Sequence, residues 1–211
     1  MTARPAPRLH LVRPLDVVAD DAYVEVAIAA ARGGVDAVHV RLPGRPAADV
    51  LAIARALREQ LPPAVAVIVN DRLDVALAAG VDGVQLGEHG LPVADARSVA
   101  ADRLLIGRSV HDLDGARRAA ATGADYLLAG HVYATTSHAG EPGRGLDWLR
   151  EIAAVAVPVI AIGGITAERI GEVMAAGAWG VALGREILLA GDPGAAARAA
   201  WERLARQTAT P

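Results

Sequence analysis

The chain of 211 residues contains no cysteine, no phenylalanine and no lysine. Without cysteine, disulfides, thiolate nucleophiles and cysteine-ligated metals are excluded. All 21 basic residues are therefore arginine, so a lysine Schiff base is excluded as a catalytic intermediate. Any bound phosphate must be held by arginine, by backbone N–H groups or by helix N-termini.

Long apolar runs are also missing. No run reaches the roughly 18 residues that a membrane-spanning helix needs. The opening MTARPAPR has no apolar segment behind its charges, which predicts that there is no signal peptide. The formal net charge of -3 argues against binding to nucleic acid through general charge. We therefore expect a cytoplasmic protein with neither a membrane nor a nucleic-acid partner.

Short runs of Val, Ile and Leu are abundant, and they alternate with alanine-rich stretches of helical period. Eight runs are predicted as strands, at Leu9–Val12, Ala37–Val40, Val65–Val69, Gly83–Leu86, Leu104–Ile106, Tyr126–Ala129, Pro158–Ile162 and Gly180–Leu183. The helical stretches between them include Tyr23–Ala31, Ala47–Leu61, Leu113–Ala121 and Ala167–Ala176. Strands that are apolar at nearly every position are typical of parallel sheets covered on both faces.

This alternation predicts an α/β protein, a single (β/α)8 TIM barrel over residues 1–211, with frayed ends at 1–8 and 207–211. A doubly wound open sheet is the alternative. An internal echo supports the barrel: GVDAVHV, GVDGVQL, GADYLLA and GAWGVAL lead into the second, fourth, sixth and eighth strands. The first glycine of each segment suits a helix C-cap, where φ is positive.

Glycines follow the last two predicted strands, and each precedes a helical stretch. Gly163 and Gly164 come after the seventh strand, and Gly184 comes before Arg185 after the eighth. Glycine loops and helix N-termini at these two places form the recurrent phosphate site of TIM barrels. Since glycines also serve ordinary βα turns, a structural role is the alternative.

A histidine follows the sixth strand and opens a long loop. His131 comes directly after Gly130, and the loop VYATTSHAGEPGRG contains Thr135. A loop of this length in a tight barrel is typical of a binding loop or lid. Histidine transfers protons readily near pH 7, so His131 is the candidate catalytic acid or base. Its alternative role is to cap the end of the strand.

Other strand ends carry further polar side chains. Arg41 suits a carboxylate or phosphate partner, with a structural ion pair as its alternative. Asn70 ends the third strand, and Ser109 and His111 follow the fifth, where a polar turn is the alternative to substrate contact. His10 and His89 are interpreted as structural or solvated.

In this order, these strand ends resemble the thiamine phosphate synthase superfamily, which includes the thiazole tautomerase (TenI) branch. The resemblance runs from LHLV to the last strand, and NDRLDVALAAGVDGVQLG, IGRSVH and PVIAIGGIT carry it. These motifs indicate the superfamily without choosing between its branches.

The branch is predicted from the positions that differ. By resemblance, a synthase joins a pyrimidine pyrophosphate to a thiazole phosphate with Mg²⁺, and its second strand reads Gln-x-Arg-x-Lys. Here His39, Arg41 and Pro43 stand at those positions, Gly90 replaces a magnesium-binding Asp, and His138 replaces a pyrophosphate-binding Lys. Of the magnesium ligands that the resemblance implies, Asp71 alone remains. Fewer charges would leave a pyrophosphate–magnesium site poorly neutralised, whereas GHVYATTSHAGEPGRG, GRSVH and HVR resemble the tautomerase.

The resemblance therefore implies an isomerase of thiamine biosynthesis that aromatises a carboxythiazole phosphate tautomer by proton transfer, without a metal or cofactor. His131 would be the acid/base, and Arg41 would hold the substrate carboxylate. Asn70 and Ser109 would orient the ring, while Gly163, Gly164, Gly184 and the Arg185 amide would bind the phosphate. The partner is then a phosphorylated thiazole.

Two alternatives remain open. One is a divergent thiamine phosphate synthase, and the other is a non-catalytic barrel that binds thiazole phosphate as a regulator. The sequence leaves the oligomeric state open, with a homodimer as one option.

Overall fold

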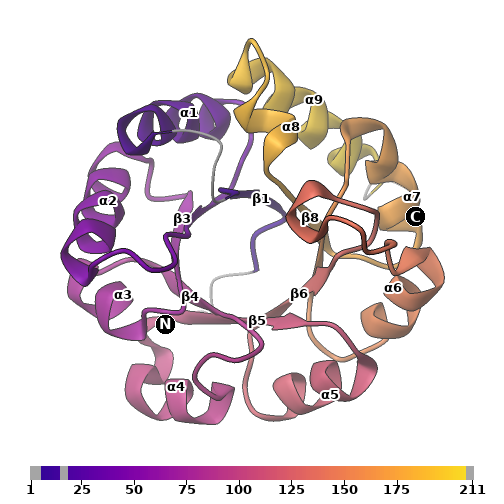
Figure 1. The fold of residues 1–211 in the computed structure, drawn as a ribbon, viewed down its shortest axis with the longest axis horizontal. Helices are drawn as coiled ribbons and strands as arrows, with labels where there is room; N and C mark the ends of the chain where they lie inside the picture. Colours follow the sequence, from indigo (N-terminus) through magenta and orange to yellow (C-terminus); the bar gives the residue numbers. More distant parts are fainter. Residues whose placement is uncertain (1–5, 15–18, 208–211) are drawn as a thin grey trace.

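The computed structural model describes residues 6–14 and 19–207. In it, eight parallel strands pair in sequence order, and β1 also pairs with β8, so that the sheet closes into a barrel (Figure 1). The strands are β1 Leu9–Val12, β2 Ala37–Val40, β3 Ala66–Asn70, β4 Gly83–Leu86, β5 Leu105–Val110, β6 Tyr126–Gly130, β7 Val159–Ile162 and β8 Gly180–Leu183. The predicted (β/α)8 barrel is confirmed.

Helices follow the strands and surround the barrel (Figure 1). The α-helices are α1 Asp20–Arg32, α2 Ala47–Gln60, α3 Leu73–Ala79, α4 Val93–Ala100, α5 Leu113–Ala121, α6 Gly145–Ala153, α7 Ile170–Ala175, α8 Arg185–Leu188 and α9 Pro193–Arg206. Short 3₁₀ turns are η1 Ala101–Arg103, η2 Thr136–His138 and η3 Ala167–Arg169. The helix predicted over 167–176 is thus divided between η3 and α7.

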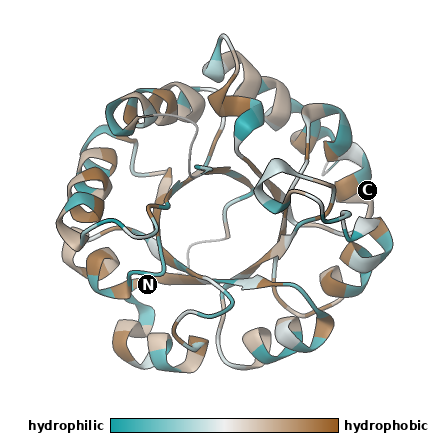
Figure 2. Cartoon of the chain, viewed as in Figure 1, coloured by the Kyte–Doolittle hydropathy of each residue, from teal (hydrophilic) through white to brown (hydrophobic). Residues whose placement is uncertain are grey.

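The strands are buried on both faces, as their composition predicts. One apolar layer lies between strands and helices, and Figure 2 shows hydrophobic colours along the strands and on parts of the surrounding helices. A second, smaller cluster lies inside the barrel and contains the small residues Ala37, Ala66 and Ala182. The interior also holds the buried polar side chains of His10, His39 and Gln85. The barrel core is therefore partly polar below the strand ends.

The internal sequence echo has a structural basis at the N-terminal ends of the strands. Its four leading glycines all have positive φ, at Gly34 (114°), Gly80 (64°), Gly123 (98°) and Gly177 (94°). Two residues after the first three glycines, an aspartate carboxylate accepts backbone N–H groups of the preceding odd-numbered strand. These bonds join Asp36 to Leu9 at 2.8 Å, Asp82 to Val67 at 2.8 Å and Asp125 to Ile106 at 2.7 Å. The aspartates therefore anchor the end of the barrel opposite the candidate residues.

The fourth copy has Trp179 where the other three have aspartate. Its backbone N–H donates to Val159 O at 2.8 Å, which matches the backbone bond of the other copies. Its indole N–H donates to Ala6 O at 2.9 Å, and the guanidinium of Arg8 lies 5.3 Å from its ring centroid. Arg8 is also held by Asp36, which accepts its backbone N–H at 2.9 Å. The predicted fraying of residues 1–8 is thus not seen at Arg8. Residues 1–5 and 208–211, where fraying was also predicted, lie outside the described residues.

We expect Asp36→Ala to lower the free energy of unfolding by about 1–3 kcal/mol, because backbone donors of Arg8 and Leu9 lose their buried acceptor. Asp36→Asn keeps one oxygen and should lose less. Urea denaturation measures both changes, and Asp114→Ala, at a mostly exposed carboxylate, is the control. Equal stability of Asp36→Ala and the wild type would show that the carboxylate is not an anchor.

Candidate active site

A pocket of about 510 Å³ opens at the C-terminal end of the barrel, and it is lined by residues at the end of each strand or directly after it. The structure brings all ten residues selected from the sequence into its lining. They are Arg41, Asn70, Ser109, His111, His131, Thr135, Gly163, Gly164, Gly184 and Arg185. The structure thus places these residues together, while the role of each stays a prediction.

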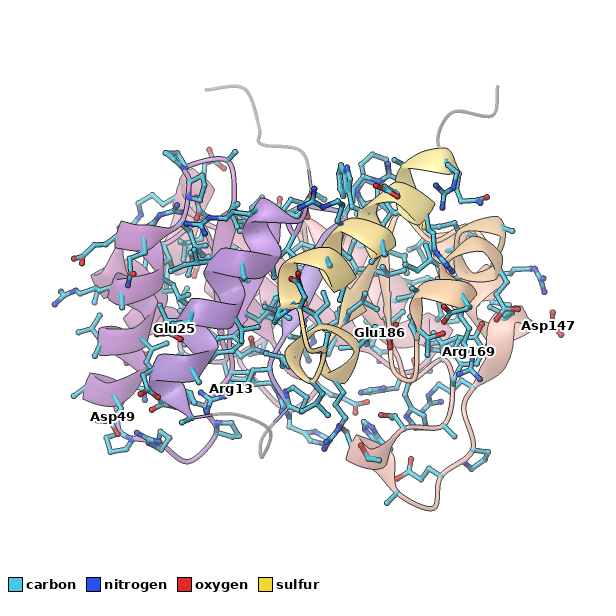
Figure 3. All side chains as sticks on the ribbon, turned by 90° about the horizontal axis from the view of Figure 1, so that it is seen from above. Arg13, Glu25, Asp49, Asp147, Arg169 and Glu186 are labelled. Carbon is cyan, nitrogen blue, oxygen red and sulfur yellow. The ribbon has the colours of Figure 1, made fainter. Side chains whose placement is uncertain are left out.

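Three guanidinium groups line this pocket, from Arg13, Arg41 and Arg185. Arg13 follows β1 and donates to Asp20 at 2.7 Å, which holds it at the rim. Figure 3 shows Arg13 at the end of the barrel from which the loop between β6 and α6 extends. Sequence reasoning missed Arg13, although its place directly after a strand is the signal used for the others. Arginine retains its charge at any physiological pH, so these side chains can pair with anions, although Asp71, Glu88 and Glu186 also line the pocket.

The loop after β7 approaches the β6 loop closely. Gly163 and Gly164 have φ values of 101° and 63°, where side chains are strained. A Cβ on Gly163 would collide with His131, and one on Gly164 would collide with the backbone of Ala134. Arg169 donates to Gly164 O at 2.7 Å from outside the pocket. Only glycine therefore allows the two loops to meet in this way.

His131 lies almost buried between the pocket and a second cavity of about 370 Å³. Its Nε2 lies 3.1 Å from Pro142 O, a carbonyl oxygen that can only accept, so Nε2 carries a proton and donates it there. His138 stacks on His131 with ring centroids 4.3 Å apart. Burial and the neighbouring His131 lower the pKa of His138. His111 donates from Nδ1 to Gly130 O at 2.7 Å.

Two buried histidines lie beneath the pocket. His39 Nε2 is 2.9 Å from His10 Nδ1, and His39 Nδ1 is 3.2 Å from the side-chain amide of Asn70. Burial lowers the pKa of His39 to about 4 and lowers that of His10 well below its ordinary value. His10 is fully buried inside the barrel. Of the two interpretations of His10, structural or solvated, the solvated one is therefore wrong.

The residues present do not form the magnesium site that the synthase resemblance implies. Asp71 Oδ1 accepts the Gly87 N–H at 2.7 Å, and a Cβ at Gly90 would lie 3.0 Å from that oxygen. An aspartate at position 90 would thus place a second carboxylate next to that of Asp71, and glycine supplies none. Among the described residues, no group of three or more His, Cys, Asp or Glu side chains is placed to hold a metal.

The match to known proteins covers nearly the whole chain. The family described as thiamine monophosphate synthase matches residues 9–187. The chain belongs to this family. It is 50% identical over 190 residues to a thiamine-phosphate synthase of Methanoculleus marisnigri, covering 87% of this chain and 88% of that protein. It is 45% identical over 191 residues to a putative thiamine-phosphate synthase of Geobacter sulfurreducens, covering 89% and 88%.

Solved structures show the same relationship. A thiamine phosphate pyrophosphorylase from Pyrococcus furiosus has a TM-score of 0.85 and 33% identity, covering 95% of this chain and 96% of its own. A 3-hexulose-6-phosphate synthase, at 24% identity and a TM-score of 0.77, shares the fold. No helix among the described residues is long and apolar enough to cross a membrane.

These relatives contradict the predicted thiazole tautomerase and its isomerase class, since they are named as synthases. The superfamily prediction was right, but the choice of branch was wrong. That choice rested on His131 directly after Gly130, and on lost charges at positions 43, 90 and 138. The comparison of charges left out the side chains of Arg13 and Arg185, which come from other strand ends and line the same pocket.

The buried histidines predict an acid-sensitive stability. Because the folded-state pKa of His39 is lowered from 6.5 to about 4, the unfolded chain binds more protons between these values. The contribution of neutral His39 to the free energy of unfolding is complete above pH 6.5. As the pH falls toward 4, on the order of 3 kcal/mol of it is lost.

Urea unfolding between pH 7.5 and 4.5 should therefore show a steeper loss of stability in the wild type than in His39→Gln. His89→Gln removes a histidine outside the barrel interior and should keep the wild-type slope. Identical slopes in the wild type and His39→Gln would contradict the assignment of this proton to His39.

Proposed function

We propose that this protein is a thiamine-phosphate synthase, a transferase that joins a pyrimidine, supplied as its pyrophosphate, to a thiazole phosphate. The observation that carries the proposal is the 50% identity over 190 residues to a protein of that name. In the reaction, a bond forms from the thiazole to the pyrimidine's carbon. The bond from that carbon to the pyrophosphate oxygen breaks, and its electron pair leaves with pyrophosphate.

The chemistry asks the protein to hold two anionic substrates and to stabilise charge on the leaving pyrophosphate. Guanidinium groups suit this task because they donate several hydrogen bonds to phosphate oxygens in a fixed planar arrangement. Arg13, Arg41 and Arg185 line the pocket and would supply that charge. The backbone of Gly163, Gly164 and Gly184 lines the pocket after β7 and β8 and would bind a phosphate group.

Magnesium, when bound to pyrophosphate, supplies charge neutralisation in synthases of this kind. Of the two carboxylates that the synthase resemblance expects, Asp71 is present and already accepts the Gly87 N–H, whereas Gly90 stands at the other position. We propose instead that the arginines carry most of the neutralisation that the protein itself provides. Of these, Arg41 stands at the arginine position of the Gln-x-Arg-x-Lys pattern that the resemblance gives for a synthase.

A second candidate function is a non-catalytic barrel that binds thiazole phosphate. It is favoured by Gly90, which stands where the resemblance expects a carboxylate, and by the absence of lysine from the chain. Such a protein would bind thiazole phosphate in a calorimetric titration and release no pyrophosphate with both substrates present.

The assay follows pyrophosphate release from the pyrimidine pyrophosphate and thiazole phosphate together, with Mg²⁺ in the buffer. We expect turnover in the wild type and a loss of roughly 10- to 100-fold in kcat/KM for Arg41→Ala, the cost of one charge-assisted contact. Arg117→Ala, at an exposed arginine of α5, is the matched control and should behave as the wild type.

Release of pyrophosphate at the rate of an enzyme-free blank would overturn the synthase proposal. Binding of thiazole phosphate in that case would favour the second candidate.

A further inference from the structure

A continuous row of hydrogen-bonding groups runs from the backbone near β1 up to the pocket. His10 Nε2 lies 3.2 Å from Pro7 O, and His10 Nδ1 lies 2.9 Å from His39 Nε2. His39 Nδ1 lies 3.2 Å from the side-chain amide of Asn70, which lines the pocket. Both rings are fully buried, and His10 packs at 5.4 Å against the ring of Tyr126.

The direction of every bond in this row follows from its lower end. Pro7 O is a carbonyl oxygen and can only accept, so His10 must carry its proton on Nε2. A neutral imidazole has one N–H, and burial keeps both rings neutral by lowering their pKa values. His10 Nδ1 therefore accepts, and His39 must donate to it from Nε2. His39 Nδ1 is then left with a lone pair that needs a donor.

Among the described residues, the side-chain amide of Asn70 is the partner that faces His39 Nδ1, so its NH₂ group must be that donor. In the structure, Oδ1 of Asn70 faces His39. In that orientation two acceptors, this oxygen and the lone pair of His39 Nδ1, would face each other. The oxygen and nitrogen of such an amide are assigned from their hydrogen-bond partners, and a half-turn exchanges them. With Nδ2 facing His39, the carbonyl oxygen of Asn70 is directed away from His39 and becomes available to the pocket.

We propose that His10 and His39 are positioning residues that hold Asn70 as a hydrogen-bond acceptor toward the pocket. Asn70 then accepts a bond from an N–H or O–H group on the ring part of a substrate, and its oxygen repels phosphate. Anions on this side of the pocket depend on Arg41, two residues after His39. The relay thus selects the end of the substrate that lies over β2 and β3.

The first test reads the protons directly and needs no substrate. In protein labelled with ¹⁵N-histidine, long-range ¹H–¹⁵N correlation spectra distinguish protonated from unprotonated ring nitrogens. We expect His10 and His39 both to be neutral with the proton on Nε2 at pH 7. A proton on Nδ1 of His39, or a doubly protonated form of either ring, would overturn the proposal.

Asn70→Asp makes the same test sharper because a carboxylate has the same shape and no N–H. His39 should then take a proton on Nδ1, either by changing tautomer or by becoming charged. Ser109→Ala, at a neighbouring pocket residue that accepts from Gln85 and not from His39, should leave both rings as in the wild type. An unchanged His39 in Asn70→Asp would show that Asn70 does not donate to it.

The kinetic test rests on the proposed synthase function. We expect His39→Phe to raise KM for one of the two ring substrates about 10-fold, while the dissociation constant of inorganic pyrophosphate changes by less than about 2-fold. His39→Gln should restore the wild-type KM, since glutamine has both an acceptor for Asn70 and a donor for His10. Parallel loss of both affinities would indicate a merely structural role.

An inactive wild type would overturn the synthase function alone, because the ring protons decide the relay separately.

Discussion

The hydrogen-bonded pairing of β1 with β8 closes the sheet, and the pocket depends on that closure. Arg13 follows β1 and Arg185 follows β8, so the two guanidinium groups reach one pocket only because these strands are neighbours. An open sheet would leave them at opposite edges. Closure also encloses His10 and His39, and this burial keeps their rings neutral and fixes the direction of their hydrogen bonds.

The two ends of the barrel have different physical tasks. At the N-terminal end, Asp36, Asp82 and Asp125 tie backbone donors of one strand to the turn before the next. At the C-terminal end, glycine loops and arginine side chains surround a cavity. Substitutions in the anchors should thus act mainly on stability, and substitutions in the pocket mainly on binding. The two histidines connect these regions through the barrel interior.

Most of the fold could be predicted from the sequence because buried parallel strands are continuous apolar runs. Four strands have the predicted bounds, whereas β5 extends beyond Ile106 to Val110. The added part contains Gly107 and the polar residues Arg108 and Ser109, which do not form an apolar run. It becomes a strand because it pairs with β6, a segment separate in the sequence. Local pattern cannot supply such a contact. The positive φ of the four repeat glycines, in contrast, is a local requirement and was predictable.

The members of the pocket were predictable for a similar reason, since strand ends meet at one rim. The choice of branch was not, because it depended on His131 after Gly130 and on charge compared position by position. A cavity responds to the sum of the charges around it, and an arginine from β1 or β8 can stand in for a lysine from another strand. Asn70 illustrates the same limit: its identity is in the sequence, but its orientation depends on His10 and Pro7, which are 60 and 63 residues away.

The arginine-only composition has a consequence at alkaline pH. An ammonium group loses its proton near pH 10, whereas a guanidinium group stays charged beyond pH 12. The positive charge of the arginines that line this pocket therefore persists through the alkaline range in which lysines would lose theirs. Amine-directed reagents such as acylating agents also find no side chain to modify anywhere in the chain, so its surface can be neither acetylated nor cross-linked through lysine.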